Sequence, residues 1–358
     1  MERDVPFLVG AYYFSAWLRD GRHWRSHPFA PRGPGGDWRR DFPEREPLCG
    51  WHDDTQGAVD VQIAQAEAHG IDFFVLLWYP PTDPADAAAW TSGLNAAVGR
   101  FLASTRIGRV RVAISYVNQS PHSFAEPAQW EAASARFVEW FAHPAYLRVG
   151  GAPVLLIHSA DRMRQQWGGG AGVRERIATL KARAVERGLP DVLVGGGLVG
   201  GGPTPLERWG ELGADGYSFM TGYNCNLLQG RRDTTERREV AYADALPRHR
   251  ELWRAGRERC TVPFVPFVTA NWDPRPWMGP DCMYWTGRSD EAFRSLLAQA
   301  RAAAEADPRP PLQHASMVLV YAWNELAEGG SVVPTWGNGY RDVEAVRDVF
   351  HPERRAQG

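Results

Sequence analysis

Two glutamates near the C-terminal end of the chain, Glu325 and Glu328, have the residue type and spacing that best fit chemistry. They follow an apolar run, Met317 to Ala322, and two glycines come directly after them. Glycines allow the backbone to turn sharply, and a tight turn can bring residues three apart onto one small site. Two carboxyl groups that lie close together disfavour each other's ionisation, so one can serve as acid and the other as base. Glycoside hydrolysis generally uses such a pair.

An alternation of apolar segments with helical patterns runs along the whole chain and would position these glutamates. Uninterrupted apolar runs of strand length are typical of buried parallel strands. We expect strands at 6–14, 71–79, 109–117, 152–159, 191–197, 214–220, 262–270 and 317–322. The patterns between and after them predict helices at 56–70, within 84–104, and at 126–142, 172–188, 204–212, 234–256, 289–306 and 341–350.

Eight strand–helix units in succession indicate an α/β protein with a (β/α)8 fold, the TIM barrel. We expect a single catalytic domain over residues 1–358, with its core at about 6–350 and a long first βα loop at 15–55. An open, doubly wound sheet is the alternative. The glycine-rich segment 195–202 does not favour it, because Pro203 and Pro205 interrupt the helix that would bind a phosphate.

Composition and charge limit the kinds of molecule that the protein is expected to bind and the compartment in which it is expected to work. A net charge of −2 gives no reason to expect binding to nucleic acid or to an anionic membrane. The longest apolar runs have strand length, so we expect no transmembrane helix. The N-terminal residues include acids and no cleavable apolar segment, which indicates a cytoplasmic protein. The four cysteines are scattered, which predicts free thiols, and no acid or histidine cluster has metal-ligand spacing. We therefore expect neither a metal nor another cofactor.

Aromatic, amide and acidic side chains gather where the predicted strands end. In a barrel of this kind the active groups lie at these exits. Flat rings stack on the C–H faces of a sugar while polar groups bind its hydroxyls, so the combination favours an oligosaccharide or polysaccharide as substrate. We expect the following residues to bind it: Tyr12, Tyr13, Trp78, Tyr79, Tyr116, Asn118, His158, Tyr223, Asn271, Trp272, Asp273, Trp323 and Asn324.

Structural explanations exist for several of these residues. Along a strand only about one of two neighbours faces inward, so each adjacent pair of aromatics could contribute one ligand and one core residue. His158 could be a core histidine, and Asp273 could end its strand in a turn with the proline that follows. Glu325 and Glu328 could open a helix capped by Asn324, although the two glycines disfavour a helix there.

Several segments resemble the glycoside hydrolase family 99-like proteins. The clearest is the ending, where "WNELAEGG" (323–330) precedes "VVPTWGNGYRDVEAVRDV" (332–349). Four others agree: "GAYYFSAW" (10–17), "HGIDFFVLLWY" (69–79), "HPAYLRVGGAPVLLIHS" (143–159) and "NWDPRPW" (271–277). The likeness extends over about residues 8–350. These proteins are (β/α)8 barrels that include endo-acting α-mannosidases and many bacterial relatives linked to polysaccharide metabolism.

The resemblance implies roles for the two glutamates. Glu325 would act as a base on the sugar 2-hydroxyl, so that a 1,2-anhydro sugar forms. Glu328 would serve as general acid and then as base, so that the configuration is retained. Two positions depart from the family pattern. Leu326 replaces a tryptophan, and Val333–Pro334 replaces an acid–proline pair. These departures bear on mannose specificity more than on the acid chemistry.

The expected function is thus a retaining glycoside hydrolase of α-linked glycans, with mannose-containing glycans as the substrates that the resemblance implies. The alternative is a barrel that binds glycans or takes part in polysaccharide biosynthesis without hydrolysis. An isomerase or aldolase is a third, weaker candidate. A Schiff-base mechanism needs a suitable lysine, and the one lysine of the chain, Lys181, falls in a predicted helix.

Overall fold

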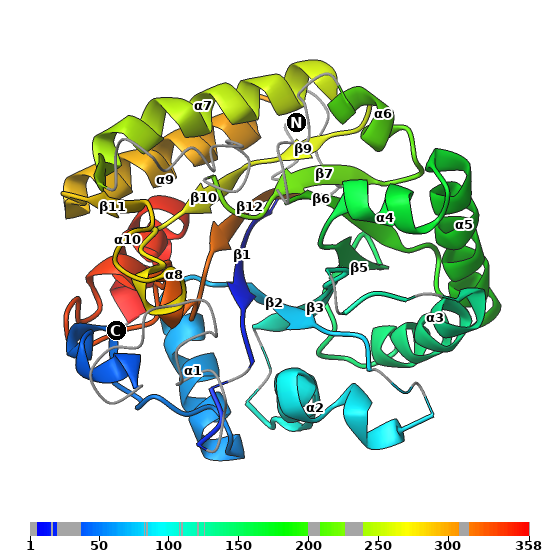
Figure 1. Ribbon diagram of the computed structural model, residues 1–358, viewed down its shortest axis with the longest axis horizontal. Helices are drawn as coiled ribbons and strands as arrows, with labels where there is room; N and C mark the ends of the chain where they lie inside the picture. The colour runs from blue at the N-terminus through cyan, green and yellow to red at the C-terminus, as the bar shows by residue number, and fades with distance from the viewer. Residues whose placement is uncertain are drawn as a thin grey trace.

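The computed structural model describes residues 6–357, apart from 16, 20–36, 82, 84, 107, 109, 120–121, 125, 200–207, 226–238 and 308–314. Parallel strands form a ring at the centre of the molecule, and helices surround them (Figure 1). In sequence order the strands of the ring are β1 (Phe7–Tyr13), β2 (Phe73–Trp78), β3 (Arg111–Tyr116), β5 (Ala152–Ile157), β6 (Leu193–Leu198), β7 (Phe219–Gly222), β9 (Phe264–Val265), β10 (Phe267–Thr269) and β12 (Ser316–Tyr321).

The ring closes through an interrupted strand. β9 pairs with β7, and β10 pairs with β12, which in turn pairs with β1. Pro266 alone separates β9 from β10 and, lacking an N–H, it breaks the ladder. Counting β9 and β10 as one strand, the order β10-β12-β1-β2-β3-β5-β6-β7-β9 contains eight strands, which is the expected (β/α)8 barrel.

The predicted strand 214–220 begins later than expected. The backbone N–H of Ala214 donates to Gly210, and that of Asp215 donates to Leu212. These bonds continue the last turn of α6 (Trp209–Gly213), so the backbone becomes extended only at Phe219. The other predicted strands are confirmed to within a few residues, because nearly all of their residues are apolar or glycine and are buried on both faces.

The helices that cover the barrel are α1 (Gln56–Ala68), α2 (Ala96–Ala103), α3 (Pro127–Phe141), α4 (Ala160–Gln166), α5 (Gly170–Glu186), α6, α7 (Tyr242–Arg259), α9 (Asp290–Glu305) and α10 (Arg341–Phe350). Side-chain caps start several of them. Thr55, Ser159 and Ser289 accept hydrogen bonds from the first turns of α1, α4 and α9. The helix α4 was not expected from the sequence.

The helix predicted at 234–256 starts later, at Tyr242, as α7. Just before it, β8 (Glu239–Ala241) pairs in parallel with β11 (Tyr284–Thr286), so this stretch is extended. Residues 234–238 and 204–207, which were also expected to be helical, lie outside the described residues. Other short elements are β4 (Arg148–Val149), α8 (Arg275–Met278) and the 3-10 turns η2 (Trp38–Arg40), η3 (Pro43–Arg45), η4 (Ala87–Trp90), η5 (Gly93–Asn95), η8 (Leu326–Glu328) and η9 (Pro352–Gln357).

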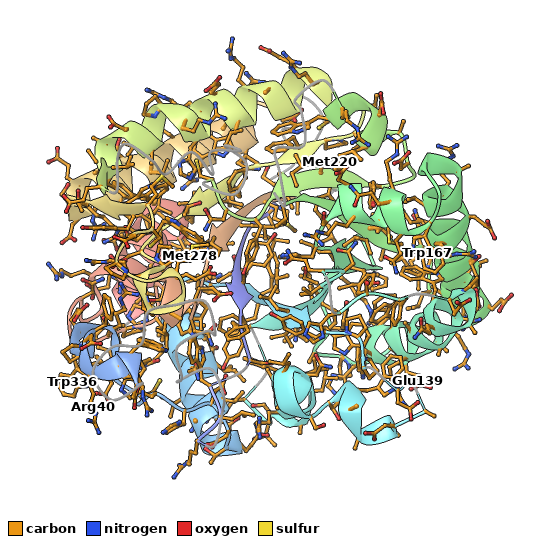
Figure 2. The ribbon with its side chains drawn as sticks, in the orientation of Figure 1. Arg40, Glu139, Trp167, Met220, Met278 and Trp336 are labelled. Carbon is orange, nitrogen blue, oxygen red and sulfur yellow. The ribbon has the colours of Figure 1, made fainter. Side chains whose placement is uncertain are left out.

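The first βα loop lies against the segment that follows β12. The backbone N–H of Leu48 donates to Pro334 at 2.8 Å, and that of Trp336 donates to Glu46 at 2.9 Å. Figure 2 shows Trp336 and Arg40 on the same side of the molecule, where the two segments meet. In the same loop the rings of Trp38 and Trp51 pack edge to face, while Trp24 lies outside the described residues. The loop thereby joins the beginning of the chain to its end.

Two expectations from composition can be compared with the structure. All four cysteines fall in the described part of the chain, and none forms a disulfide. No helix in the described ranges has both the length and the apolar character needed to cross a membrane.

Candidate active site

The turn that carries both glutamates follows β12 directly. Glu325 caps η8 and Glu328 is the last residue of η8. Gly329 then takes a left-handed conformation, with φ of 66°. Gly330 is required for a different reason, because a Cβ there would lie 2.2 Å from the ring of Tyr321. The two glycines therefore allow one sharp turn rather than a continuing helix, as the sequence predicted.

Each glutamate accepts a hydrogen bond from a tyrosine hydroxyl. Tyr223, just after β7, donates to Glu325 Oε1 at 2.8 Å. Tyr321, the last residue of β12, donates to Glu328 Oε2. The two phenol rings meet edge to face, with their centroids 4.9 Å apart. Two carboxyl groups and two hydroxyls therefore form one connected cluster.

Burial acts on the pKa values of both acids, and repulsion by Glu328 acts on that of Glu325. Glu325 is 6% exposed, and this burial raises its pKa well above the usual value. The charge of Glu328 raises the pKa of Glu325 further, whereas the hydrogen bond from Tyr223 lowers it. Burial also raises the pKa of Glu328, against a lowering by Tyr321. A pair of this kind favours the state that holds a single proton.

Four of the residues expected to bind a ligand lie in or beside this cluster: Tyr223 is part of it, and Tyr12, Tyr79 and His158 lie next to it. The ring of Tyr223 packs edge to face against Tyr12 at 4.7 Å and against His158 at 4.6 Å. Burial raises the pKa of Tyr79, and the charges of Glu325 and Glu328 raise it further, so its hydroxyl lies within electrostatic reach of both acids.

Three of these side chains keep polar atoms available for a ligand. Within the described ranges, no hydrogen bond reaches the hydroxyls of Tyr12 and Tyr79 or the ring nitrogens of His158. Burial, with a smaller effect from Arg162, lowers the pKa of His158 to about 3. The imidazole is therefore neutral near pH 7 and can both donate and accept a hydrogen bond.

Four other expected ligands lie between the strands and the outer helices, which corrects the prediction for Tyr13, Trp78, Tyr116 and Trp323. The hydroxyl of Tyr13 donates to Asp53 at 3.2 Å, and the indole N–H of Trp323 donates to Gln62 of α1 at 2.8 Å. Tyr13 and Trp323 are both fully buried in this layer. The phase of the strand alternation, which the sequence does not reveal, places Tyr12 inward and its neighbour Tyr13 outward.

Trp78 and Tyr116 pack against α3. The ring of Trp78 meets Phe137 edge to face at 5.1 Å, and the ring of Tyr116 lies 6.0 Å from that of Trp130. Both residues have no exposed surface. They stabilise the contact between the barrel and its outer helix and have no surface to offer a ligand.

Two of the expected amide ligands instead bind backbone, which corrects their assignment. Asn118 exchanges two hydrogen bonds with the backbone of Ser159, at 2.8 and 2.9 Å. Asn324 does the same with Phe14, at 2.8 Å in both directions. These amides join the ends of neighbouring strands. Asn271 differs, since its buried carbonyl oxygen has no hydrogen-bond partner among the residues that the structure describes.

The carboxylate of Asp273 is fully occupied by two arginines and is not free to bind a ligand. Arg275 binds both carboxyl oxygens of Asp273, at 2.7 Å each, and Arg45 binds one of them. The backbone N–H of Asp273 donates to the carbonyl of Glu328 at 2.6 Å. Asp273 therefore anchors the turn, which corrects its assignment as a ligand. The ring of Trp272 lies 6.3 Å from that of Tyr321 and is 5% exposed.

Sequence reasoning missed two residues of this site. Tyr321 had a signal, because it carries the one hydroxyl in the apolar run 317–322. Arg45 had none that separates it from the other arginines of the first loop. In the described part of the chain, no group of three histidines, cysteines or acids could hold a metal ion.

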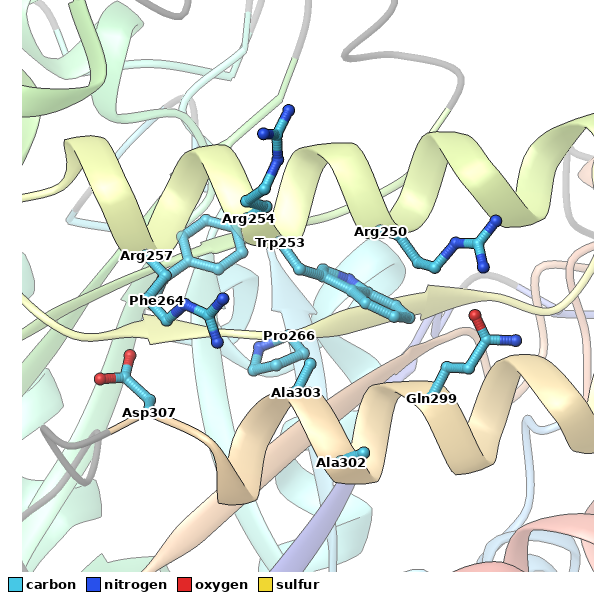
Figure 3. Close-up of a pocket in the computed structure, with 10 residues that line it drawn as sticks. All are labelled: Arg250, Trp253, Arg254, Arg257, Phe264, Pro266, Gln299, Ala302, Ala303 and Asp307. Carbon is cyan, nitrogen blue, oxygen red and sulfur yellow. The ribbon is translucent and has the colours of Figure 1, made fainter.

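A cavity of about 320 Å³ lies away from these residues, between α7 and α9 (Figure 3). Arg250, Trp253 and Arg257 line it from α7, and Gln299 lines it from α9. None of its lining residues belongs to the cluster around the two glutamates.

Comparison with solved structures shows the fold. A glycoside hydrolase-like protein matches with a TM-score of 0.65 and 15% identity, over 98% of this chain and 95% of that one. The GH99 endo-alpha-mannosidase from Bacteroides thetaiotaomicron matches with a TM-score of 0.59 and 16% identity, over 97% of each chain. A GH5_18 protein from Streptomyces cattleya, in complex with GlcNAc, matches with a TM-score of 0.51 and 11% identity, over 99% and 82%.

The resemblance to family 99-like barrels is thereby confirmed at the level of fold. No curated protein matches the chain. The family model of the WbsX glycosyltransferases matches residues 120–346, a range that includes β12 and the turn with both glutamates. Because this match covers well over half of the chain, the protein belongs to the WbsX glycosyltransferase family.

Proposed function

We propose that the protein is a retaining glycoside hydrolase of α-linked glycans, with Glu325 and Glu328 as its catalytic pair. One observation carries the proposal. Both carboxyls project from one turn at the exit of β12, and the charge of one raises the pKa of the other. This arrangement favours a singly protonated pair, which contains the acid and the base that glycoside hydrolysis needs. The described residues, with their core at about 6–350, act in this proposal as a single catalytic domain.

The surroundings of the pair support a carbohydrate substrate. Tyr12, Tyr79 and His158 offer rings and unpaired polar atoms beside the acids. Rings that carry a polar end suit a sugar, which has apolar C–H faces and hydroxyl edges. A mannose-containing glycan is the candidate that the family 99-like resemblance favours, and Glu325 and Glu328 keep the roles that this resemblance implies.

For these roles, the shared proton must lie on Glu328, the general acid, and not on Glu325, the base. In the protein alone, burial and the charge of Glu328 raise the pKa of Glu325, which favours the protonated form of Glu325. The proposed base, however, is Glu325. A sugar 2-hydroxyl that donates a hydrogen bond to Glu325 stabilises its carboxylate, and the proton then moves to Glu328. Substrate binding thus prepares the acid for the leaving group.

The experiment is a glycan panel scored for new reducing ends. It compares wild type with Glu325→Gln and Glu328→Gln. Each variant is expected to lose at least about 10³-fold in kcat, since the acid–base step is removed. Asp215→Asn is the control, because Asp215 is a buried acid outside the cluster. Full activity of either glutamine variant would remove that residue from the mechanism.

A second function is favoured by the family match to WbsX glycosyltransferases. In this alternative the barrel binds glycans or serves polysaccharide synthesis without hydrolysis. The same panel separates the two functions when a second arm adds a sugar acceptor and a nucleotide-activated sugar, whose nucleotide is the leaving group in elongation. New reducing ends support hydrolysis. Elongated products that form only with the nucleotide-activated sugar, or binding without cleavage, support the alternative.

A further inference from the structure

We infer that Arg45, supplied by the first βα loop, is a positioning residue that holds the turn carrying Glu325 and Glu328 in its catalytic geometry. The inference rests on the proposed function for its catalytic consequence. The Nη1 group of Arg45 donates to the carbonyl oxygen of Leu326 at 3.1 Å and to that of Asp273 at 3.1 Å. Leu326 lies between the two glutamates, so one guanidinium contacts the middle of the turn.

The same guanidinium reaches the turn by a second route. Its Nη2 group binds the carboxylate of Asp273, and the backbone N–H of Asp273 donates to the carbonyl of Glu328 at 2.6 Å. Arg275 binds both oxygens of that carboxylate in a fork, with two bonds of 2.7 Å, and shares one of these oxygens with Arg45. Arg45 therefore bridges the exits of β10 and β12, and Asp273 is the shared link.

The hydrogen bonds that close η8 are long, whereas those at the ends of the segment are short: Leu326 donates to Asn324 at 2.8 Å and Ala322 donates to Gly330 at 2.5 Å. Glu328 and Gly330 each donate to the carbonyl of Glu325 at 3.2 Å, and Gly329 donates to Leu326 at 3.3 Å. Most N–H···O bonds in proteins are shorter, near 2.9–3.0 Å. A single 3-10 turn with such bonds is a weak structure by itself. Arg45 and Asp273 add contacts to the first and the last residue of η8, at 3.1 and 2.6 Å.

Burial makes the clamp of Arg45 and Asp273 stronger than a surface ion pair. The two side chains are 10% and 9% exposed, and the guanidinium of Arg45 lies 4.1 Å from the ring centroid of Phe42. There is also little free space beside Gly329, where a Cβ would lie 3.1 Å from that of Asp273 and 3.4 Å from the guanidinium carbon of Arg45. Breaking one partner of a buried pair leaves the other without its counter-charge.

The backbone on both sides of Arg45 is fixed by the last βα loop. Gly337 donates to the carbonyl of Glu44 at 2.8 Å, and Trp336 donates to that of Glu46 at 2.9 Å. The loop therefore presents the guanidinium at one place. No bond in the described residues joins Arg45 to the carboxyl group of Glu325 or Glu328, so its role is to position these acids and not to react.

Hydrogen–deuterium exchange of the segment 322–330 tests the inference without any substrate. Wild type is compared with Arg45→Ala, Arg45→Lys and the matched control Arg164→Ala. Arg164 also pairs with a buried acid, Asp215, that keeps a second arginine, Arg174. In Arg45→Ala the segment is expected to exchange about tenfold faster or more, as the loss of charged hydrogen bonds implies. In Arg164→Ala it exchanges at the wild-type rate. Unchanged exchange in Arg45→Ala overturns the inference.

Kinetics test the catalytic consequence on a substrate found in the glycan panel. Arg45→Ala is expected to lower kcat about 10²-fold, with KM within about twofold, because a misplaced acid affects the reaction step more than binding. Added methylguanidine restores part of kcat. The Arg45→Lys variant is expected to recover less than half of the kcat that Arg45→Ala loses. An ammonium lacks the planar fork that bridges two carbonyls and a carboxylate. Arg164→Ala keeps wild-type kcat per folded molecule.

The exchange experiment and the kinetic experiment together distinguish a failure of this inference from a failure of the proposed function. If wild type cleaves no glycan, the hydrolase proposal fails, and the exchange of 322–330 still decides the role of Arg45. If exchange accelerates while kcat stays at the wild-type value, the positioning role in catalysis is overturned. Arg45→Lys keeps the buried charge, so it supplies a folded variant if Arg45→Ala does not fold.

Discussion

The hydroxyl of Tyr223 donates a hydrogen bond of 2.8 Å to Glu325, although the two residues are 102 positions apart in the sequence. The bond crosses from the exit of β7 to the exit of β12. It stabilises the ionised form of an acid whose pKa is raised by burial and by Glu328. The ring of Tyr223 also contacts Tyr12 and His158, so this one residue links the acids to the ligand-binding side chains.

Removal of that hydroxyl in Tyr223→Phe is expected to lower activity at pH 7 about tenfold. Without the donor, the pKa of Glu325 rises further, and the acidic limb of the kcat/KM profile moves to higher pH. Steady-state rates across pH measure the shift. Tyr217→Phe is the control, because its buried hydroxyl has no hydrogen-bond partner in the described residues. Superimposable profiles for Tyr223→Phe and wild type would contradict the prediction.

Glu325→Gln is expected to stabilise the fold at alkaline pH. The pKa of Glu325 is raised in the folded state, so the folded protein binds a proton more tightly than the unfolded chain does. Its contribution to stability is therefore fully present below the unfolded pKa, about 4.3, and is lost as the pH rises toward the folded pKa. Glutamine keeps an acceptor for Tyr223 and carries no charge. We expect a gain of about 1 kcal/mol or more at pH 8 and almost none at pH 4.

Urea unfolding at the two pH values measures this gain. Asp37→Asn is a comparison variant whose change in stability at pH 8 has the opposite sign, since the hydrogen bond from Arg39 lowers the pKa of Asp37. Its contribution is present above the unfolded pKa and is lost as the pH falls, so that variant is expected to be less stable than wild type at pH 8. Equal stability of wild type and Glu325→Gln at both pH values would argue against a buried, repelled carboxylate at position 325.

Gly329→Ala is expected to damage both stability and activity, whereas Gly339→Ala damages stability alone. Both glycines have positive φ, 66° and 56°, where an alanine costs about 1–2 kcal/mol. A Cβ at Gly329 would also press on Asp273, at 3.1 Å, whereas a Cβ at Gly339 would meet nothing within 4 Å. Thermal unfolding and kcat, measured side by side, check this. Equal kcat values in the two variants would separate the turn geometry from catalysis.

Tyr79→Phe is expected to raise KM about fivefold to tenfold and leave stability unchanged, because its hydroxyl has no partner in the described part of the protein. Tyr13→Phe is the matched variant with the reverse outcome. Its hydroxyl binds the buried Asp53, so its removal costs about 1 kcal/mol of stability and leaves KM unchanged. A rise in KM for Tyr13→Phe would restore that residue to the ligand site.

The sequence by itself determined the barrel, the position of the acid pair and the sharpness of its turn. Runs such as 71–79 and 317–322 are apolar throughout because helices cover both faces of a parallel strand, and this signal is local. Two acids at the exit of such a strand, followed by two glycines, likewise form a local pattern. The exceptions, at 214–218 and 239–241, are segments in which turn or strand hydrogen bonds replaced the expected element.

Only the tertiary structure decided which side chains meet at the site. Alternation along a strand shows that Tyr12 and Tyr13 face opposite ways, but its phase depends on how the barrel closes. Asp273 and Asn324 have the chemistry of ligands, yet their partners, Arg45 and Phe14, lie 228 and 310 positions away and occupy their polar atoms. Arg45 contacts Leu326 across 281 positions. Contacts of this range arise when the first and last strands pair, so no local pattern contains them.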